Sequence, residues 1–294
     1  MNDREFLADR FEAHRGHLKA VAYRMLGSLT EAEDAVQEAW LRLSRSEPDD
    51  VRNLGGWLTT VVGRVCLDML RARTSRREEP LEARMPDPVV SPATGPDPEQ
   101  AALLADSVGL ALLVVLESLA PAERLAFVLH DMFAVPFEEI APLVGRSPAT
   151  ARQLASRARR RVRGAAPVPD PDLARQREIV EAFLAAAHRG DFAGLVSVLD
   201  PEVVLRADAG ALSGGLREVR GADNVAGQAL AFRRHAPSTA HAALVNGLAG
   251  VVNTVNGEPS AVMSFTIAGG RIVEIDILAD PARLARLDLA VLGD

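Results

Sequence analysis

Two proline-rich segments interrupt the chain and limit what it can fold into. The first, at about 78–100, reads EEPLEARMPDPVVSPATGPDPEQ and is also acidic, and the second, around 164–172, reads GAAPVPDPD. Because proline lacks the amide hydrogen that a helix interior needs, we expect no continuous helix in either segment and no packed core in the first. The chain is therefore predicted to fold as three blocks, at 1–77, 101–164 and 172–294, with an acidic linker and a short spacer between them.

The composition indicates a protein with true hydrophobic cores. The chain has 294 residues, of which 48% are hydrophobic and 25% charged, enough for two or three domains. The apolar run Leu110–Leu116 is much shorter than the roughly 20 residues that span a bilayer, and the N-terminus is charged where a secretory signal would be apolar. A single cysteine, Cys66, excludes an internal disulfide and a cysteine-clustered zinc site. We therefore expect a cytoplasmic protein without membrane partner, metal or cofactor.

Hydrophobic periodicity predicts that the first two blocks are all helical. In the first block, helices are expected over Phe6–Met25, from Thr30 to about Leu43 and from about Leu54 to Arg73, the second of them opening on the capping-box sequence T-E-A-E. In the second block, helices are expected at about 103–118, 121–132, 136–143 and 148–163.

The third block changes period along its length. Two helices are expected first, at 173–188 and 191–199. Strands then follow, with Asn-Gly and Gly-Gly turns, at Val203–Ala207, Ala242–Val245, Gly250–Val255, Ser260–Ile267 and Ile272–Leu278. Helices followed by a meandering sheet indicate an α+β domain.

The sharpest local pattern is a short helix, a glycine turn and a basic helix. Ser147 is expected to cap the basic helix and Pro148 to occupy its first turn. One face of this helix is apolar, and the opposite face carries Ala149, Arg152, Gln153, Ser156, Arg159, Arg160 and Arg163, with Thr150 at the margin. The pattern is typical of a helix-turn-helix that offers arginine and glutamine to a DNA major groove. The alternative is an ordinary helix with a solvated basic face, which charge alone would favour.

Two helices of the first block also carry polar faces. The helix from Leu54 turns one set of side chains away from its apolar stripe: Asn53, Trp57, Thr60, Arg64, Asp68 and Arg71. An aromatic ring beside arginines suits unstacked bases, although core packing of Trp57 is an equal alternative. The helix from Thr30 presents Asp34, Gln37, Glu38 and Leu41. This acidic face either docks a basic partner or belongs to an ordinary amphipathic helix, and spacing does not choose between them.

Taken in order, these segments resemble a known family. EAEDAVQEAWLRL (31–43), GGWLTTVVGRVCLDMLRAR (55–73) and LAPAERLAFVLHDMFAVPFEEIAPLVGRSPATARQLASRARRRVR (119–163) are similar to conserved domains two and four of an extracytoplasmic-function (ECF) bacterial RNA polymerase sigma factor. The resemblance implies two all-α sigma domains, the second with a helix-turn-helix, and a function in promoter-specific transcription initiation. The implied partners are the β and β′ subunits of core RNA polymerase and promoter DNA.

The resemblance also assigns roles by position. Polymerase contacts fall at Asp34, Gln37 and Glu38. The surface that reads the −10 element falls at Asn53, Trp57, Arg64, Asp68 and Arg71. The helix that reads the −35 element carries, on it or beside it, Arg146, Thr150, Arg152, Gln153, Ser156, Arg157 and Arg160.

The third block is similar to the SnoaL-like, NTF2-like C-terminal extension of the SigJ-type subgroup. This resemblance implies an α+β cone that modulates the sigma factor and whose pocket could hold a small ligand. Subgroup members carry a proline-acid-proline motif in the linker and an Asn-Pro-Asp-Lys-Leu motif near the C-terminus. The corresponding residues, which the resemblance assigns to a regulatory interdomain contact, are Pro86, Asp87, Pro88, Asp280, Pro281, Arg283 and Leu284.

Two other functional classes remain as alternatives. One is a ligand-sensing helix-turn-helix regulator that binds DNA without polymerase. The other is a cyclase or isomerase of the NTF2-like type whose N-terminal half targets it to DNA, with a pocket acid or base among Asp208, His235, His241 and Asp276. None of these four has a partner at diagnostic spacing, so we expect no catalytic residues and no enzyme.

Overall fold

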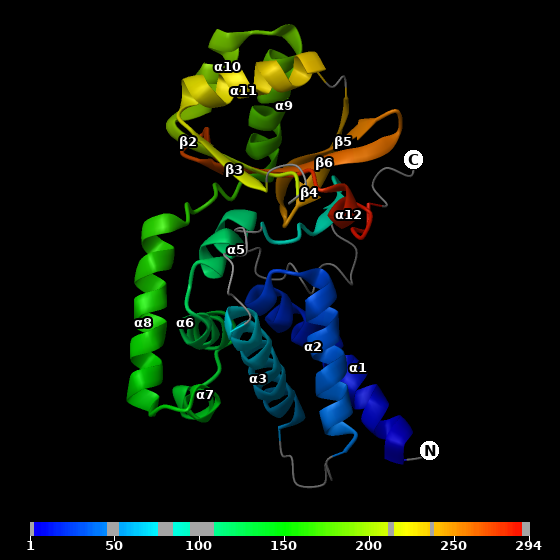
Figure 1. Cartoon of the computed structure of the whole chain (residues 1–294), viewed down its shortest axis with the longest axis vertical. Helices are drawn as coiled ribbons and strands as arrows, with labels where there is room; N and C mark the ends of the chain where they lie inside the picture. The colour runs from blue at the N-terminus through cyan, green and yellow to red at the C-terminus, as the bar shows by residue number, and fades with distance from the viewer. Residues whose placement is uncertain are drawn as a thin grey trace. The chain divides into compact units, whose positions relative to one another are not determined.

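A computed structural model describes residues 3–45, 53–75, 85–94, 109–210, 215–235 and 238–289. The chain divides into two compact units (Figure 1). We call the first, residues 1–80, 101–106 and 113–165, the helical unit, and the second, residues 81–100, 107–112 and 166–294, the sheet unit.

Within the described residues, every regular element of the helical unit is a helix, as the sequence predicts. Its first part contains α1 (Asp3–Leu26), α2 (Leu29–Leu43) and α3 (Leu54–Ser75). Its second part contains α6 (Pro121–Phe127), the π-helix η2 (Val128–Met132), α7 (Phe137–Val144) and α8 (Pro148–Ala165). Helix α5 (Leu110–Glu117) begins in the sheet unit and ends in the helical unit. No helix among the residues described is long and apolar enough to cross a bilayer.

Two local predictions in this unit need correction. Helix α2 is capped by Ser28, whose hydroxyl accepts a hydrogen bond from the Glu31 amide, so the helix begins before Thr30. The capping-box pattern placed the start of α2 at Thr30. Ser28, directly before Leu29, is an equally good capping residue and is the one that caps the helix. The helix expected at 121–132 is α-helical only to Phe127 and then widens into η2.

The sheet unit contains a seven-stranded mixed sheet in the order β1-β4-β5-β6-β7-β2-β3. The strands are β1 (Val90–Pro92), β2 (Leu199–Asp208), β3 (Leu216–Arg220), β4 (Thr239–Val245), β5 (Leu248–Val255), β6 (Glu258–Ala268) and β7 (Arg271–Leu278). The helices are α9 (Leu173–Arg189), α10 (Phe192–Val198), α11 (Ala222–His235) and the short α12 (Pro281–Leu284). The α+β prediction for this part of the chain is confirmed.

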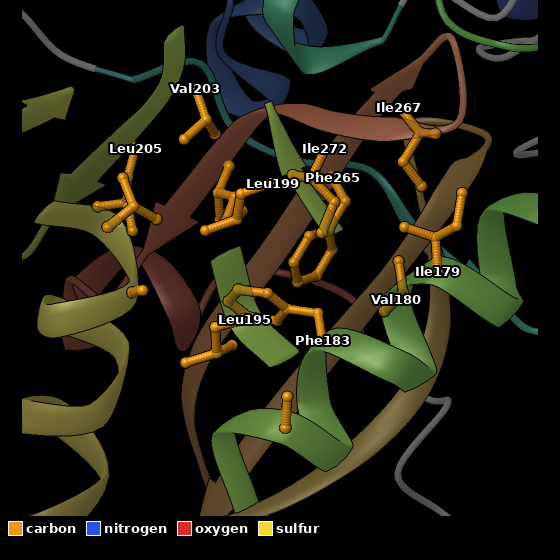
Figure 2. Packing of buried hydrophobic residues seen from close by; sticks show 14 of the residues in the cluster. Ile179, Val180, Phe183, Leu195, Leu199, Val203, Leu205, Phe265, Ile267 and Ile272 are labelled. Carbon is orange, nitrogen blue, oxygen red and sulfur yellow. The ribbon is translucent and has the colours of Figure 1, made fainter. Parts of the chain in front are cut away.

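The core of the sheet unit lies between helices α9 to α11 and one face of the sheet (Figure 2). Phe183 of α9 and Phe265 of β6 meet edge to face, with ring centroids 5.6 Å apart. Leu195, Leu199 and Ile275 are buried around them.

The linker is more ordered than its composition suggests. The expectation that 78–100 forms no packed core is wrong for its middle, because every residue from Met85 to Ser91 is buried. Strand β1 pairs with β4 in antiparallel register, and the Val89 amide donates to the side chain of Asn246 at 3.1 Å. Prolines are tolerated in this segment because it consists of an edge strand and the extended residues that precede it. Few backbone amide hydrogens are needed there for hydrogen bonds to a neighbouring strand.

Candidate nucleic-acid interface

Helix α8 is positioned by a turn that its own sequence encodes. Helix α7 ends at Gly145, whose φ of 65° is left-handed, a conformation that glycine adopts without strain. The Ser147 hydroxyl then accepts a hydrogen bond from the Thr150 amide at 3.3 Å and so caps α8. Ala151, Ala155 and Ala158 are buried, which fixes the rotation of the helix. The short side chains allow α8 to pack closely on its neighbours while its opposite face points outward.

The predicted −35 residues fall on that outward face, apart from Arg146, which lies in the turn before α8. Six of them are exposed and Thr150 is half-buried; the exposed ones are Arg146, Arg152, Gln153, Ser156, Arg157 and Arg160. The guanidinium of Arg152 lies 5.2 Å from the ring centroid of Phe137. This cation–π contact holds the Arg152 stem against α7 and leaves its planar end oriented before any ligand arrives.

Acids within the fold divide the arginines of α8 into two sets. Arg157 and Arg161 both pair with the largely buried Glu123, at 3.7 and 3.1 Å. Arg159 pairs with Asp131 at 2.6 Å. Between described residues, no ion pair joins an acid to the second set, which is Arg146, Arg152, Arg160 and Arg163. The second set therefore carries uncompensated positive charge suited to phosphates and to guanine edges.

The predicted −10 residues also share one face. Asn53, Arg64, Asp68 and Arg71 are exposed, and Trp57 is half-buried. The Asn53 side chain accepts a hydrogen bond from the Gly56 amide at 3.0 Å, so it caps α3 as well as facing solvent. Half-burial leaves part of the Trp57 ring packed and part accessible. The two alternatives for Trp57, core packing and base contact, are therefore compatible.

The acidic face of α2 lies beside a shallow groove. Asp34 and Gln37 are exposed, while Glu38 accepts a hydrogen bond from Arg42 at 2.9 Å. Leu41 keeps 40% of its surface exposed, whereas five other apolar residues of the same helix are buried: Ala32, Ala35, Val36, Ala39 and Leu43. A groove of about 390 Å³ between α1 and α2 is lined in part by Gln37 and Trp40. Acid, exposed leucine and groove together suit a partner that is basic and partly apolar.

The linker and the C-terminal motif meet at one buried arginine. Arg283 of α12 donates to Asp87 of the linker at 2.5 Å, to Asp208 of β2 at 2.7 Å and to the Met85 carbonyl at 2.6 Å. The Met85 amide donates to the same Asp208 at 3.2 Å. All of these groups belong to the sheet unit, and Arg283 is only 3% exposed.

The remaining residues of the two motifs frame this arginine. Asp280 caps α12 by accepting from the Ala282 amide at 2.9 Å, and Leu284 is buried. Pro86 and Pro88 are buried on either side of Asp87, whereas Pro281 is exposed at the first turn of α12. The structure therefore brings the two motifs together through Asp87 and Arg283, which lie 196 residues apart.

Three of the four acid and base candidates of the third block have structural partners. Asp208 binds Arg283, and His241 is hydrogen-bonded to Thr254 at 3.1 Å. Asp276 accepts from Arg206 at 3.2 Å, and the side chain of His235 lies outside the described residues. No cluster of three or more His, Cys, Asp or Glu side chains suited to a metal occurs in the described part of the chain.

Asp276 belongs to a buried charge network that sequence inspection did not find. Arg206 of β2 reaches Asp276 and Glu274 of β7, both almost fully buried. Burial is the main cause that raises the pKa of Asp276 to about 7, Arg206 opposes the rise, and the charge of Glu274 adds to it. The alternation of Glu274 and Asp276 in a strand was a visible signal, because two acids then share one face of the sheet.

Comparison with known proteins agrees with this geometry. Residues 10–76 match the family model Sigma-70 region 2, and residues 109–162 match Sigma-70, region 4. The chain is 41% identical to the ECF RNA polymerase sigma factor SigJ of Mycobacterium tuberculosis over 92% of this chain and 91% of the relative. It is 36% identical to the probable ECF RNA polymerase sigma factor SigI of the same organism, over 97% of both chains.

A solved structure supports the same assignment over the whole chain. The crystal structure of M. tuberculosis SigJ superposes with a TM-score of 0.77 and 36% identity, covering 96% of this chain and 99% of that one. The similarity therefore includes the sheet unit as well as the helices. The chain belongs to the extracytoplasmic-function RNA polymerase sigma factors.

Proposed function

We propose that this sigma factor reads the −35 element of its promoters with α8 and the −10 element with the exposed face of α3. The observation that carries the proposal is the division of charge on α8 and the turn before it. Among the described residues, no acid forms an ion pair with Arg146, Arg152 or Arg160, whereas Arg157 and Arg161 pair with Glu123. An arginine that is already paired with an acid of the protein is less available to DNA than an uncompensated one. On this basis Arg157, which the family pattern places among the DNA contacts, contributes less than Arg152 or Arg160.

Core RNA polymerase is the proposed protein partner. Asp34, Gln37 and Leu41 on α2 and the adjoining groove offer an acidic surface with an apolar centre, which fits a basic, partly apolar surface of the β′ subunit. We assign polymerase and −10 binding to residues 1–77 and −35 binding to 101–164. Copurification with core polymerase from the cytoplasm would distinguish a sigma factor from a ligand-sensing repressor, because the repressor binds DNA without polymerase.

Regulation is proposed to work through the linker. Because Met85 to Ser91 are buried in the sheet unit, the acidic linker is not available to lie in a positively charged polymerase channel until it is released. Arg283 holds it through Asp87. The sheet unit thereby modulates initiation without a separate anti-sigma protein.

Reconstituted run-off transcription tests the proposal. Core polymerase with this chain is expected to initiate at promoters from which core polymerase alone does not initiate. Arg152→Ala or Arg160→Ala should reduce output: a lost base contact costs about 1–3 kcal/mol and relaxes one promoter position, whereas a lost phosphate contact lowers the salt slope by about one unit. Arg175→Ala is the matched control, because Arg175 is exposed on α9 and pairs with Glu178. Failure to initiate at any promoter would contradict the proposed function in promoter reading.

A further inference from the structure

Two aromatic side chains support one arginine of the exposed face of α8. The ring of His130 in η2 stacks on the ring of Phe137 in α7, with centroids 3.8 Å apart and an interplanar angle of 28°. The guanidinium carbon of Arg152 lies over the same Phe137 ring, 5.2 Å from its centroid. Because Phe137 is only 7% exposed, its ring is held by packing. We call His130 and Phe137 the aromatic support of Arg152.

The backbone around His130 is unusual at two places. His130 lies in the π-helix η2, and Ala134 has a left-handed φ of 54° although it is not a glycine. The imidazole Nδ1 of His130 donates to the Val135 carbonyl at 3.1 Å, because a carbonyl oxygen can only accept. π-helical turns and left-handed residues other than glycine are strained, and they are concentrated at functional sites. This turn restrains the rotation of the His130 ring that contacts Phe137.

The contact with Phe137 leaves the hydrogen-bond donors of Arg152 available. A guanidinium has five N–H donors, and the face of a phenyl ring attracts the cation without supplying a lone pair to any of them. Within the described part of the chain, no acid or carbonyl accepts a hydrogen bond from the Arg152 side chain. The O6 and N7 atoms of guanine accept two hydrogen bonds from one guanidinium. Arg152 therefore combines a restrained position with free donors.

The other arginines of α8 lack one of these two properties. Arg157, Arg159 and Arg161 each pair with an acid of the protein. Arg160 pairs with no described acid, but no described aromatic ring supports it either. It also lies eight residues beyond Arg152, about 12 Å further along the helix axis. Because the N-terminal residues of a recognition helix contact base edges, Arg152 is better placed for a base and Arg160 for a phosphate.

We infer that Arg152 reads a guanine of the −35 element, and that Phe137 and His130 are positioning residues that determine how strongly this guanine is preferred. The inference rests on the proposed function and adds to it one base contact and the two side chains behind it. Without the aromatic support, the guanidinium would have to be ordered when DNA binds. That cost would weaken the contact with guanine and leave binding to the other bases unchanged, so the preference would fall.

A base-preference profile of the −35 element tests the inference. Run-off transcription by core polymerase with the full-length chain is measured on promoters in which each −35 position carries each base in turn. With the wild type, one position should favour guanine by about fivefold or more. Arg152→Lys keeps the charge but loses the planar fork, so it should remove this preference. Phe137→Leu should reduce the preference to less than twofold, whereas Phe137→Tyr, which keeps the ring, should retain it.

Phe127→Leu is the matched control for the loss of a buried ring. Phe127 ends α6 and is 7% exposed, the same fraction as Phe137. Both leucine variants should therefore lower the melting temperature of the protein. Only Phe137→Leu should change the preference for guanine, and it should do so at the position that Arg152→Lys affects. Preferences at the other −35 positions should stay within twofold of the wild type in both variants.

The outcomes separate the inference from the proposed function. The inference is overturned if Phe137→Leu keeps the guanine preference of the wild type, or if it weakens the preferences at all −35 positions alike, as a purely structural role would. If Phe137→Leu does not fold, Arg152→Lys decides, because its side chain is exposed: a guanine preference that survives this substitution overturns the inference. Wild-type output that depends on no −35 position would instead contradict the proposed function.

Discussion

At the scale of single residues, Arg283 shows how one buried charge can depend on distant parts of a sequence. Its guanidinium lies between the carboxylates of Asp87 and Asp208, both largely buried. A buried pair adds little stability compared with apolar residues of the same shape, but removal of one partner leaves a charge without compensation. The arginine is therefore better suited to fixing where the linker lies than to stabilising the sheet unit as a whole.

Replacing this arginine should detach the linker. Arg283→Met keeps much of the side-chain volume but removes the cation that Asp87 and Asp208 share, at an expected cost of about 3–5 kcal/mol. Limited proteolysis should then cut the segment 85–94 at lower protease concentration than in the wild type. Arg286→Met is the control, because the Arg286 side chain is exposed and donates to the nearby Ala282 carbonyl. Equal protection of the segment in both variants would contradict the role of Arg283.

Asp276 should make the stability of the sheet unit depend on pH. Its pKa is about 7 in the folded chain, against an ordinary value of 3.8. Between these values the folded chain keeps a proton that the unfolded chain has lost. The free energy of unfolding should therefore fall as pH rises from 4 to 7, by at most about 1.4 kcal/mol per pH unit, and level off above 7. Urea unfolding at pH 5.5, 6.5 and 7.5 measures this, and Asp276→Asn should flatten the dependence. An unchanged slope in that variant would show that other groups cause it.

At the scale of elements, the start of α2 offers a clean comparison of two neighbouring hydroxyls. Ser28 caps the helix and Thr30 lies within its first turn. Ser28→Ala should lower the free energy of unfolding of the helical unit by about 1 kcal/mol, whereas Thr30→Ala should cost clearly less. Thermal unfolding of the two variants measures the difference. A larger loss for Thr30→Ala would support the capping box that the sequence had suggested.

Elements whose partners lie nearby in the chain could be predicted from the sequence. Helices α7 and α8 follow from Gly145, Ser147 and the alanine face, and β4 to β7 follow from alternation and turn residues. The exposed residues of α3 and α8 follow from helical period alone. These features depend on residues that lie close to one another in the sequence.

Elements that depend on distant partners were missed. Strand β1 exists because Asn246 and the edge of β4 receive it, and β3 is a short, charged edge strand that reads as a loop. Helix α11, which contains Gly227 and only moderate periodicity, was not predicted. The burial of Gly63 of α3 against Leu125 and Leu129 was also missed, because a glycine carries no hydrophobic signal of its own.

At the scale of the whole molecule, the linker belongs structurally to the sheet unit, although in sequence it connects the first and second parts of the helical unit. Deletion of 279–294 removes Arg283 and should therefore free the linker and raise promoter output in run-off transcription. Residues 1–164 should keep their fold, which circular dichroism of the deleted protein would check through its helical signal. Output equal to that of the full chain would show that the β1–β4 pairing alone retains the linker.

The burial of Met85, Val89 and Val90 has a practical consequence for anyone who dissects this protein. A shortened chain that ends at residue 165 would keep these apolar side chains but lose the surface that covers them. Such a fragment should self-associate at concentrations at which the intact protein stays monodisperse. Replacing the three side chains by serine should prevent this self-association. Poor solubility of the unmodified fragment would therefore not indicate that its DNA-binding helices are unstable.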